Sequence, residues 1–330
     1  MTLICAIISF LITLISGKFI IRYLRKLKCG QTIYEEGPSW HKDKNGTPTM
    51  GGIMFILGII VSAVIAIVVF SLKNNVFIAT DLVPMISGLL MALLFSLIGF
   101  VDDYVKVVKK RNLGLTAIQK LIFQFLTAGA FLFAMFISGT GETTVHIPFI
   151  ATIDLGFFYY PIMAVLIVFV TNAVNLTDGL DGLASSVTAV CGVGYLVIAV
   201  IIDFTLTASV SAALLGGVMA FLVYNAYPAK VFMGDTGSMF LGGMVVMLAF
   251  TLKDPGLIIL MAGLYILEAL SVMLQVFWYK LTHKRIFLMS PIHHHYEKKG
   301  LKEPQIVTMF SAVELVFVIA AVVSVILARR

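Results

Sequence analysis

The sequence predicts an all-α polytopic membrane protein with about ten transmembrane helices, and three observations favour this fold class. First, 60% of the 330 residues are hydrophobic and only 12% are charged, whereas soluble domains carry about 25% charged residues. Second, apolar stretches of roughly the 20 residues that cross a bilayer recur along the chain. Third, the basic residues gather between alternate apolar stretches. Because long polar segments are missing from the sequence, we expect residues 1–330 to form a single integral membrane domain.

The candidate spans follow one another closely. We place them at 3–23, 51–72, 82–101, 116–137, 160–175, 182–202, 207–225, 237–252, 256–279 and 305–328. The fifth and the eighth are the shortest, so their limits are the least well defined. The first span lacks the basic leader and the small-residue cleavage site of a signal peptide, so we expect it to be retained.

Loop charge predicts the orientation of these spans. If the N-terminus lies outside, the inside segments are 22–50, 102–120, 172–181, 226–236 and 280–304. They hold 18 of the 23 lysines and arginines, and the five exceptions are Lys18, Lys73, Lys253, Arg329 and Arg330. This positive-inside pattern accounts for the net charge of +6 without a nucleic-acid partner. It predicts that both termini face outside.

Two further features concern the outside and the cysteines. Residues 140–160 alternate apolar and polar side chains and contain Gly and Pro, which predicts a short outside β-hairpin between the fourth and fifth spans. A lid or a dimer contact is its expected role.

The three cysteines, Cys5, Cys29 and Cys191, are widely spaced and odd in number, so the sequence predicts no disulfide framework.

Five aspartates fall at or near the inside ends of spans. They lie in the patches GFVDDY, NLTDGLDG and FMGDTGS and are Asp102, Asp103, Asp178, Asp181 and Asp235. A single carboxylate there is more often a helix cap or the partner of a lysine, but carboxylates near a bilayer are costly and indicate function by default. Together the five predict one acidic cluster open to water. A divalent cation would relieve their mutual repulsion, and oxygen ligands suit Mg²⁺ or Mn²⁺. We therefore expect a site for a metal ion and a diphosphate.

The polar residues around these aspartates leave alternatives open. Asn172 and Asn175 are three residues apart and share a helix face, and Asp178 and Asp181 repeat that spacing. Asp178 and the neighbouring threonine are alternatively caps of the next span. Asp235 is a candidate N-cap that leaves backbone N–H groups exposed to an anion.

Aromatic and histidine residues extend the candidate site. Phe232 is either a membrane anchor or a surface on which a base stacks. In the last inside loop, successive residues point in different directions, which argues against a three-histidine zinc site at His293, His294 and His295. Beside two lysines they suit recognition of phosphates or a polar headgroup. In the ninth span, Glu268 and Gln275 share one helix face and line either a groove or a helix contact.

Several motifs together resemble a known superfamily. GFVDDYVKVVKKRNLGL, NAVNLTDGLDGLA, NAYPAKVFMGDTGS, SPIHHHYEKKG and KNGTPTMGG are similar to segments of the polyprenyl-phosphate N-acetylhexosamine-1-phosphate transferase superfamily. The resemblance covers nearly the whole chain and is closest to the phospho-N-acetylmuramoyl-pentapeptide translocase family of bacterial peptidoglycan synthesis. The loop with three histidines is the best discriminator, because relatives that use simpler donors vary there.

The resemblance implies a reaction and its setting. UDP-MurNAc-pentapeptide and undecaprenyl phosphate would give lipid I and UMP, with Mg²⁺ as cofactor. The enzyme would lie in the bacterial cytoplasmic membrane, with its active site on the cytoplasmic face, as a homodimer. We also consider a GlcNAc-1-phosphate transferase for another glycan. An ion-coupled transporter is disfavoured, because transporters place their sites near the bilayer midplane and often show repeats.

The resemblance also implies roles for individual residues. Asp235 would bind Mg²⁺, and Asp102 would be the candidate base on the lipid phosphate, with Asp103 beside it. Other positions would contact the substrates. These are Asn172 and Asp178 in the acidic cleft, Lys120 on a phosphate, Asn175, Asn225, Phe232 and Gln275 around the uridine, and His293, His294 and His295 on the donor.

Overall fold

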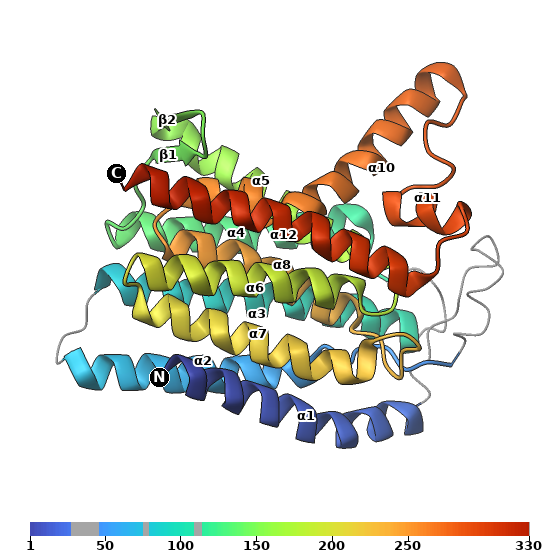
Figure 1. Cartoon of the computed structure of the whole chain (residues 1–330), viewed down its shortest axis with the longest axis horizontal. Helices are drawn as coiled ribbons and strands as arrows, with labels where there is room; N and C mark the ends of the chain where they lie inside the picture. The colour runs from blue at the N-terminus through green and yellow to red at the C-terminus, as the bar shows by residue number, and fades with distance from the viewer. Residues whose placement is uncertain (28–45, 75–78, 109–113, 330) are drawn as a thin grey trace.

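The computed structural model describes residues 1–27, 46–74, 79–108 and 114–329. Within these ranges, ten helices are long and apolar enough to cross a membrane, which confirms the predicted fold class (Figure 1). They are α1 (Thr2–Lys26), α2 (Ile53–Asn74), α3 (Ala79–Val108), α4 (Ala117–Ile137), α5 (Tyr159–Thr177), α6 (Leu183–Ile201), α7 (Thr205–Asn225), α8 (Gly234–Thr251), α10 (Gly263–Thr282) and α12 (Glu303–Ala328). The expectations for residues 28–45 and 109–113, which include Cys29 and half of the basic residues of the first inside loop, lie outside the described residues.

Helix α8 lies at the centre of the bundle, and small residues allow its neighbours to approach. A Cβ atom added to Gly243 would lie 2.7 Å from the Cα of Ala92 on α3. One added to Gly242 would lie 2.7 Å from the Cα of Thr171 on α5. Such close backbone contacts between small residues are the usual means of packing helices within a bilayer. They bring the ends of α3, α5 and α8 together, where the predicted acidic residues lie.

The predicted β-hairpin is present. Strands β1 (Thr144–Ile147) and β2 (Ala151–Asp154) pair antiparallel, with Thr144 opposite Asp154. A 3-10 turn, η2 (Gly156–Phe158), leads from it into α5. The hairpin and both chain termini lie toward the same end of the bundle in Figure 1. The opposite end carries the described parts of all the segments that the sequence assigns to the inside.

The ninth span differs from the single helix predicted over 256–279. The chain forms a 3-10 turn, η3 (Pro255–Leu257), and a short helix, α9 (Ile258–Met261), before α10 starts at Gly263. The buried carboxylate of Glu314, from α12, accepts the N–H of Leu264 at 2.8 Å. An interrupted helix leaves backbone donors without partners, and Glu314 satisfies one of them. Beyond the break, α10 leaves the bundle at an angle and is followed by the short helix α11 (Ile292–Lys298) (Figure 1).

Candidate active site

Three of the predicted aspartates meet where α3 and α8 lie side by side. Asp102 and Asp103 lie in the C-terminal part of α3, and Asp235 lies in the first turn of α8. One carboxylate oxygen from each lies within 4.8 Å of the others. The side chains of Asp102 and Asp103 are buried, whereas that of Asp235 is partly exposed. The three therefore form a compact acidic group with one accessible member.

Asp103 holds the start of α8. Its Oδ2 accepts hydrogen bonds from the backbone N–H of Thr236 at 2.9 Å and from the Thr236 hydroxyl at 2.7 Å, and its Oδ1 accepts the N–H of Asp235 at 3.2 Å. Helix α8 has Met233 at its N-cap position and no side-chain cap of its own. The prediction that Asp235 caps this helix is therefore wrong. The anion at the helix N-terminus is the carboxylate of Asp103, so the carboxylate of Asp235 is left for other contacts.

Two lysines bridge the aspartates. Lys120 Nζ lies 2.8 Å from Asp235 Oδ2, and Lys106 Nζ lies 3.3 Å from the same oxygen. Lys106 also lies 2.6 Å from Asp102 Oδ2, while Asp102 Oδ1 accepts the N–H of Leu115 at 2.8 Å. The two ammonium groups offset the repulsion among the carboxylates. Lys106 was missing from the predicted site residues, although its position four residues after Asp102 places both on one face of α3.

Helix α5 contributes an amide to Asp235. Asn175 Nδ2 donates to Asp235 Oδ1 at 3.0 Å and to Ser238 Oγ at 2.7 Å. One turn earlier, the side-chain amides of Asn172 and of Gln124 on α4 donate hydrogen bonds to one another, at 2.8 and 3.1 Å. The two asparagines thus share a helix face as predicted, but they have different partners. Gln124 was not predicted, and its spacing of four residues from Lys120 is the signal that indicates it.

The second acidic pair lies between α5 and α6. Asp178 follows the last residue of α5, and α6 begins after Gly182, whose φ of 78° is in the left-handed region. The hydroxyl of Thr177 donates a hydrogen bond to the carbonyl of Ala173 in α5, at 2.8 Å. The alternative that Thr177 and Asp178 cap the next span is therefore wrong. Asp181 Oδ2 accepts the N–H of Ala229 at 2.9 Å, which ties the loop after α7 to this turn.

The loop between α7 and α8 is fixed by Asn225. This side chain is only 2% exposed, and its Nδ2 donates to the carbonyl of Val231 at 3.0 Å. Phe232 is half-buried, and its backbone pairs with the segment before α2: its N–H donates to Pro48 and its carbonyl accepts from Gly51, both at 2.8 Å. Asn225 therefore orders the loop, and Phe232 remains partly exposed.

The three histidines have different partners. Each uses Nδ1 for a different partner: His293 meets Glu268 Oε1 at 3.0 Å, His294 meets Glu297 Oε2 at 2.6 Å, and His295 accepts the N–H of Leu288 at 3.1 Å. His293 is completely buried. Burial and the ammonium group of Lys299 lower the pKa of His295 below its ordinary value, which agrees with its role as an acceptor. Among the described residues, these imidazoles do not converge on a metal site.

Gln275 holds the loop that precedes α11. Its Oε1 accepts the N–H groups of Ile286 and Phe287 at 3.1 and 2.9 Å, and its Nε2 donates to the carbonyl of Phe287 at 3.2 Å. Glu268 lies two turns earlier on the same face of α10 and contacts His293. The predicted shared face of Glu268 and Gln275 therefore holds the histidine segment against α10.

The acidic group fits a hard divalent cation. Asp102, Asp103 and Asp235 offer three carboxylate oxygens at one place, and oxygen ligands are those that Mg²⁺ prefers. Asp235 is the most accessible of the three. Asp103 already accepts three hydrogen bonds from α8.

Comparison with known proteins shows which family the chain belongs to. The profile described as glycosyl transferase family 4 matches residues 85–253, the part of the chain that contains Asp102, Asp103 and Asp235. The fold and the site thus define an integral membrane glycosyl transferase of family 4. The pattern described as phospho-N-acetylmuramoyl-pentapeptide-transferase signature 1 matches residues 44–56.

Close relatives identify the family within that class. The phospho-N-acetylmuramoyl-pentapeptide-transferase of Caldicellulosiruptor bescii is 47% identical over 97% of this chain and 96% of its own length. Those of Halalkalibacterium halodurans and Bacillus subtilis are 45% and 44% identical, over 97% and 96% of this chain and 96% and 95% of their own. The chain belongs to the phospho-N-acetylmuramoyl-pentapeptide-transferase family, which confirms the resemblance seen in its motifs.

Proposed function

We propose that this protein transfers phospho-MurNAc-pentapeptide from UDP-MurNAc-pentapeptide to undecaprenyl phosphate, giving lipid I and UMP for peptidoglycan synthesis. The observation that carries the proposal is the group of Asp102, Asp103 and Asp235 with two lysines at one end of a ten-span bundle. Both substrates are phosphate anions, and one of them is a membrane lipid. A cationic and acidic site at the end of membrane-spanning helices suits a reaction between them.

The lysines counter the repulsion between the two substrates. Lys106 and Lys120 each offer an ammonium group at Asp235, and both can donate to phosphate oxygens. Phosphoryl transfer depends mainly on positioning and on stabilising charge. Asn175 orients the carboxylate of Asp235 through its amide. Lys106, Lys120 and Asn175 would together fix the diphosphate of the donor beside the acceptor.

Mg²⁺ is the proposed cofactor, with Asp235 as its principal ligand and Asp102 as a second. When bound, the cation neutralises charge that develops on the diphosphate. Asp103 would act indirectly, because its oxygens already hold the N-terminus of α8. Asp235 and Asp102 would thus bind the cation, whereas Asp103 would position Asp235.

Direct attack by the lipid phosphate is the favoured route. An acceptor oxygen would attack the β-phosphorus of the donor, the bond from that phosphorus to the bridging oxygen would break, and UMP would leave with that oxygen. A lipid phosphate is already an anion near neutral pH, so a strong base is not required. Asp102 is buried, and its two oxygens contact Lys106 and the N–H of Leu115. This arrangement supports a charge-balancing role over a covalent nucleophile.

Other parts of the chain are proposed to bind the donor and to set its surroundings. Phe232 would stack on uracil beside the amide of Asn175. Asn225 would hold the loop that carries Phe232, Gln275 would hold the loop before α11, and Asn172 and Asp178 would line the cleft. His293, His294 and His295 would hold the donor, with the fully buried His293 acting through its contact with Glu268 on α10. We place the acidic end on the cytoplasmic face of the bacterial inner membrane, because the basic residues gather there. We also propose one domain per chain and a homodimer.

The test measures UMP release by the purified protein in detergent with undecaprenyl phosphate. UDP-MurNAc-pentapeptide or UDP-GlcNAc is supplied with Mg²⁺ or EDTA, for the wild type, Asp235→Asn and the matched control Asp203→Asn. Asp203 is an exposed aspartate at the hairpin end. We expect UMP from the MurNAc donor alone, only with Mg²⁺, and lost in Asp235→Asn but not in Asp203→Asn. Release from UDP-GlcNAc alone would instead support the transferase for another glycan, and release by neither donor would overturn both functions.

A further inference from the structure

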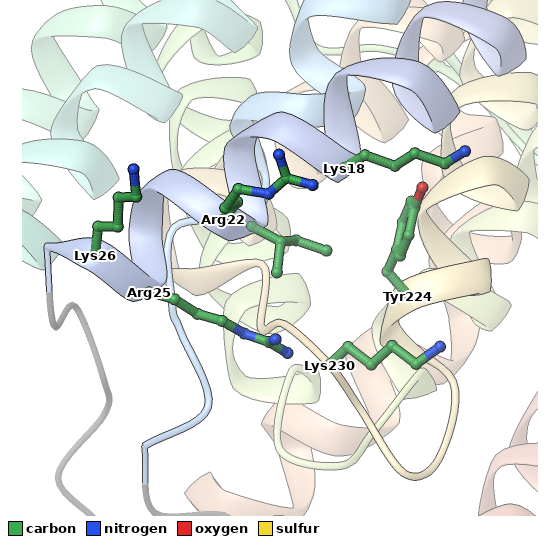
Figure 2. Close-up of a pocket in the computed structure, with 7 residues that line it drawn as sticks. Lys18, Arg22, Arg25, Lys26, Tyr224 and Lys230 are labelled. Carbon is green, nitrogen blue, oxygen red and sulfur yellow. The ribbon is translucent and has the colours of Figure 1, made fainter.

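A basic pocket lies away from the acidic group, between α1 and α7. Its volume is about 560 Å³, and it is lined by Lys18, Ile21, Arg22, Arg25, Lys26, Tyr224 and Lys230. Four of its cations come from the last turns of α1, and Lys230 comes from the loop after α7. In Figure 2 the side chains of Arg25, Lys230 and Tyr224 border the space, whereas that of Lys26 points away from it. None of its lining residues is acidic, and none belongs to the group around Asp235. The pocket therefore needs its own explanation.

The walls of the pocket are fixed by contacts between α1 and α7. The Tyr224 hydroxyl donates to the carbonyl of Leu14 at 2.7 Å. A Cβ atom on Gly17 would lie 2.5 Å from Cε2 of Tyr224, so the glycine allows the ring to lie against α1. The backbone N–H of Lys230 donates to the carbonyl of Tyr224 at 2.8 Å. Tyr224 thus joins both walls, and the pocket is built into the fold.

The charges in the pocket lack a counter-ion among the described residues. Lys18, Arg22 and Lys26 follow one another at four-residue spacing on α1, an arrangement of like charges that destabilises a helix. In the described part of the chain, the ion pairs involve other residues. An anion bound in the pocket would relieve this repulsion, and phosphate is an anion that arginines and lysines bind through charge-assisted hydrogen bonds.

The position of the pocket points to a membrane lipid. Lys18 lies within the membrane-spanning helix α1. The exposed apolar residues Leu11 and Ile15 precede it on the same helix face, at spacings of four and three residues. An acyl chain lying along Leu11 and Ile15 would bring its headgroup to Lys18 and Arg22. A soluble phosphate would gain nothing from this continuous apolar approach.

We propose that the pocket between α1 and α7 binds the phosphate headgroup of an anionic bilayer lipid. Basic pockets between transmembrane helices on the cytoplasmic side are a common form of anionic-lipid site. Such binding would also anchor the first helix. The proposal concerns different residues from the proposed reaction, so either can fail without the other.

The test uses native mass spectrometry of the purified full-length protein titrated with dioleoylphosphatidylglycerol or dioleoylphosphatidylcholine. Lys18→Gln/Arg22→Gln removes two cations of the pocket. Lys280→Gln/Lys284→Gln, the matched control, removes two exposed lysines at the end of α10. We expect the wild type and the control to retain phosphatidylglycerol more strongly than phosphatidylcholine. The pocket variant should lose this affinity by roughly 10- to 30-fold, the effect of two cations near an anionic surface.

A second variant guards against a folding defect. Lys230→Gln changes only the loop wall of the pocket, and we expect a loss of roughly 5-fold in phosphatidylglycerol affinity. Equal retention of the two lipids by the wild type would overturn the proposal, as would equal losses in the pocket variant and the control. Displacement of phosphatidylglycerol by millimolar inorganic phosphate or UMP would also overturn it, because the site would then belong to a soluble phosphate.

Discussion

Asp103 and Thr236 are joined by two hydrogen bonds across the contact between α3 and α8. One carboxylate oxygen of Asp103 accepts both the backbone N–H and the hydroxyl of Thr236, at 2.9 and 2.7 Å. These bonds fix the first turn of α8, which carries Asp235. The carboxylate of Asp103 on α3 therefore positions the carboxylate of Asp235 on α8. The adjacent Asp102 instead contacts Lys106, so the two neighbouring aspartates have different roles.

This relationship predicts that Asp103 acts on stability as well as on activity. Asp103→Asn leaves α8 without an anionic cap, and we expect a loss of about 1–3 kcal/mol in the free energy of unfolding. UMP release should fall at least about 10-fold as Asp235 shifts. Thr236→Val removes one hydrogen bond and should cost about 1 kcal/mol, whereas Thr236→Ser keeps it. Thermal unfolding in detergent measures the stability changes of the Asp103 and Thr236 variants. An Asp103→Asn protein that is inactive yet as stable as the wild type would instead place Asp103 on the substrate.

A second prediction concerns the two lysines that share Asp235 Oδ2. Lys106→Met and Lys120→Met each remove an ammonium group from the acidic group, and we expect kcat/KM for UMP release to fall by roughly 100-fold in each. The double variant should lose less than the product of the two, because both act on the same carboxylate. Lys280→Met is the control. Strictly multiplicative losses would show that the lysines act at separate places.

Much of the fold could be predicted because a bilayer imposes a simple rule on the sequence. Spans such as 116–137 and 207–225 match α4 and α7 within a residue or two, since length and hydropathy alone define them. The break before α10 could not be predicted in this way. It depends on Glu314, 50 residues from Leu264, and an apolar stretch carries no signal for a carboxylate that arrives from another helix.

The acidic residues of the site could be predicted from the sequence, but their hydrogen-bond partners could not. The predicted helix ends place Asp102, Asp103 and Asp235 at one end of the bundle. Their separate roles depend on which donor each carboxylate oxygen accepts a hydrogen bond from, and the sequence does not show this. Asn225 and Gln275 illustrate the limit, because their motif positions indicate the substrate while their amides bond to the backbone of nearby loops. Only the tertiary structure distinguishes an amide that orders a loop from one that is free for a ligand.

A third prediction uses the reciprocal amide pair of Gln124 and Asn172. Each side chain donates to the other, at 3.1 and 2.8 Å, and Gln124 is fully buried. Asn172→Leu alone leaves the amide of Gln124 without this partner and should cost about 1–3 kcal/mol in stability. Gln124→Leu/Asn172→Leu removes both polar groups and should recover most of that loss. Thermal unfolding of the two single variants and the double variant gives the coupling energy, and additive losses would contradict the pairing.

The hairpin end of the bundle carries a carboxylate that should make stability depend on pH. Asp254 precedes η3, and its Oδ2 lies 3.5 Å from Nδ1 of His146 on β1, while its Oδ1 is buried without a hydrogen-bond partner. Burial raises the pKa of Asp254 above its ordinary value, and His146 opposes this only in part. A raised pKa in the folded state means that the folded protein binds more protons than the unfolded chain. The contribution of Asp254 to stability is therefore complete below its ordinary pKa and is lost as the pH rises through the folded-state value.

We accordingly expect Asp254→Asn to raise the unfolding temperature near neutral pH, because the amide removes a charge that burial disfavours. The difference from the wild type should shrink as the pH falls toward the ordinary pKa of the carboxyl group, where the wild-type side chain is itself neutral. Thermal unfolding in detergent between about pH 4 and pH 8 measures this trend. Asp203→Asn at the same end removes an exposed charge and serves as the control. A stabilisation that is independent of pH, or one that Asp203→Asn reproduces, would show that the buried charge of Asp254 is not its cause.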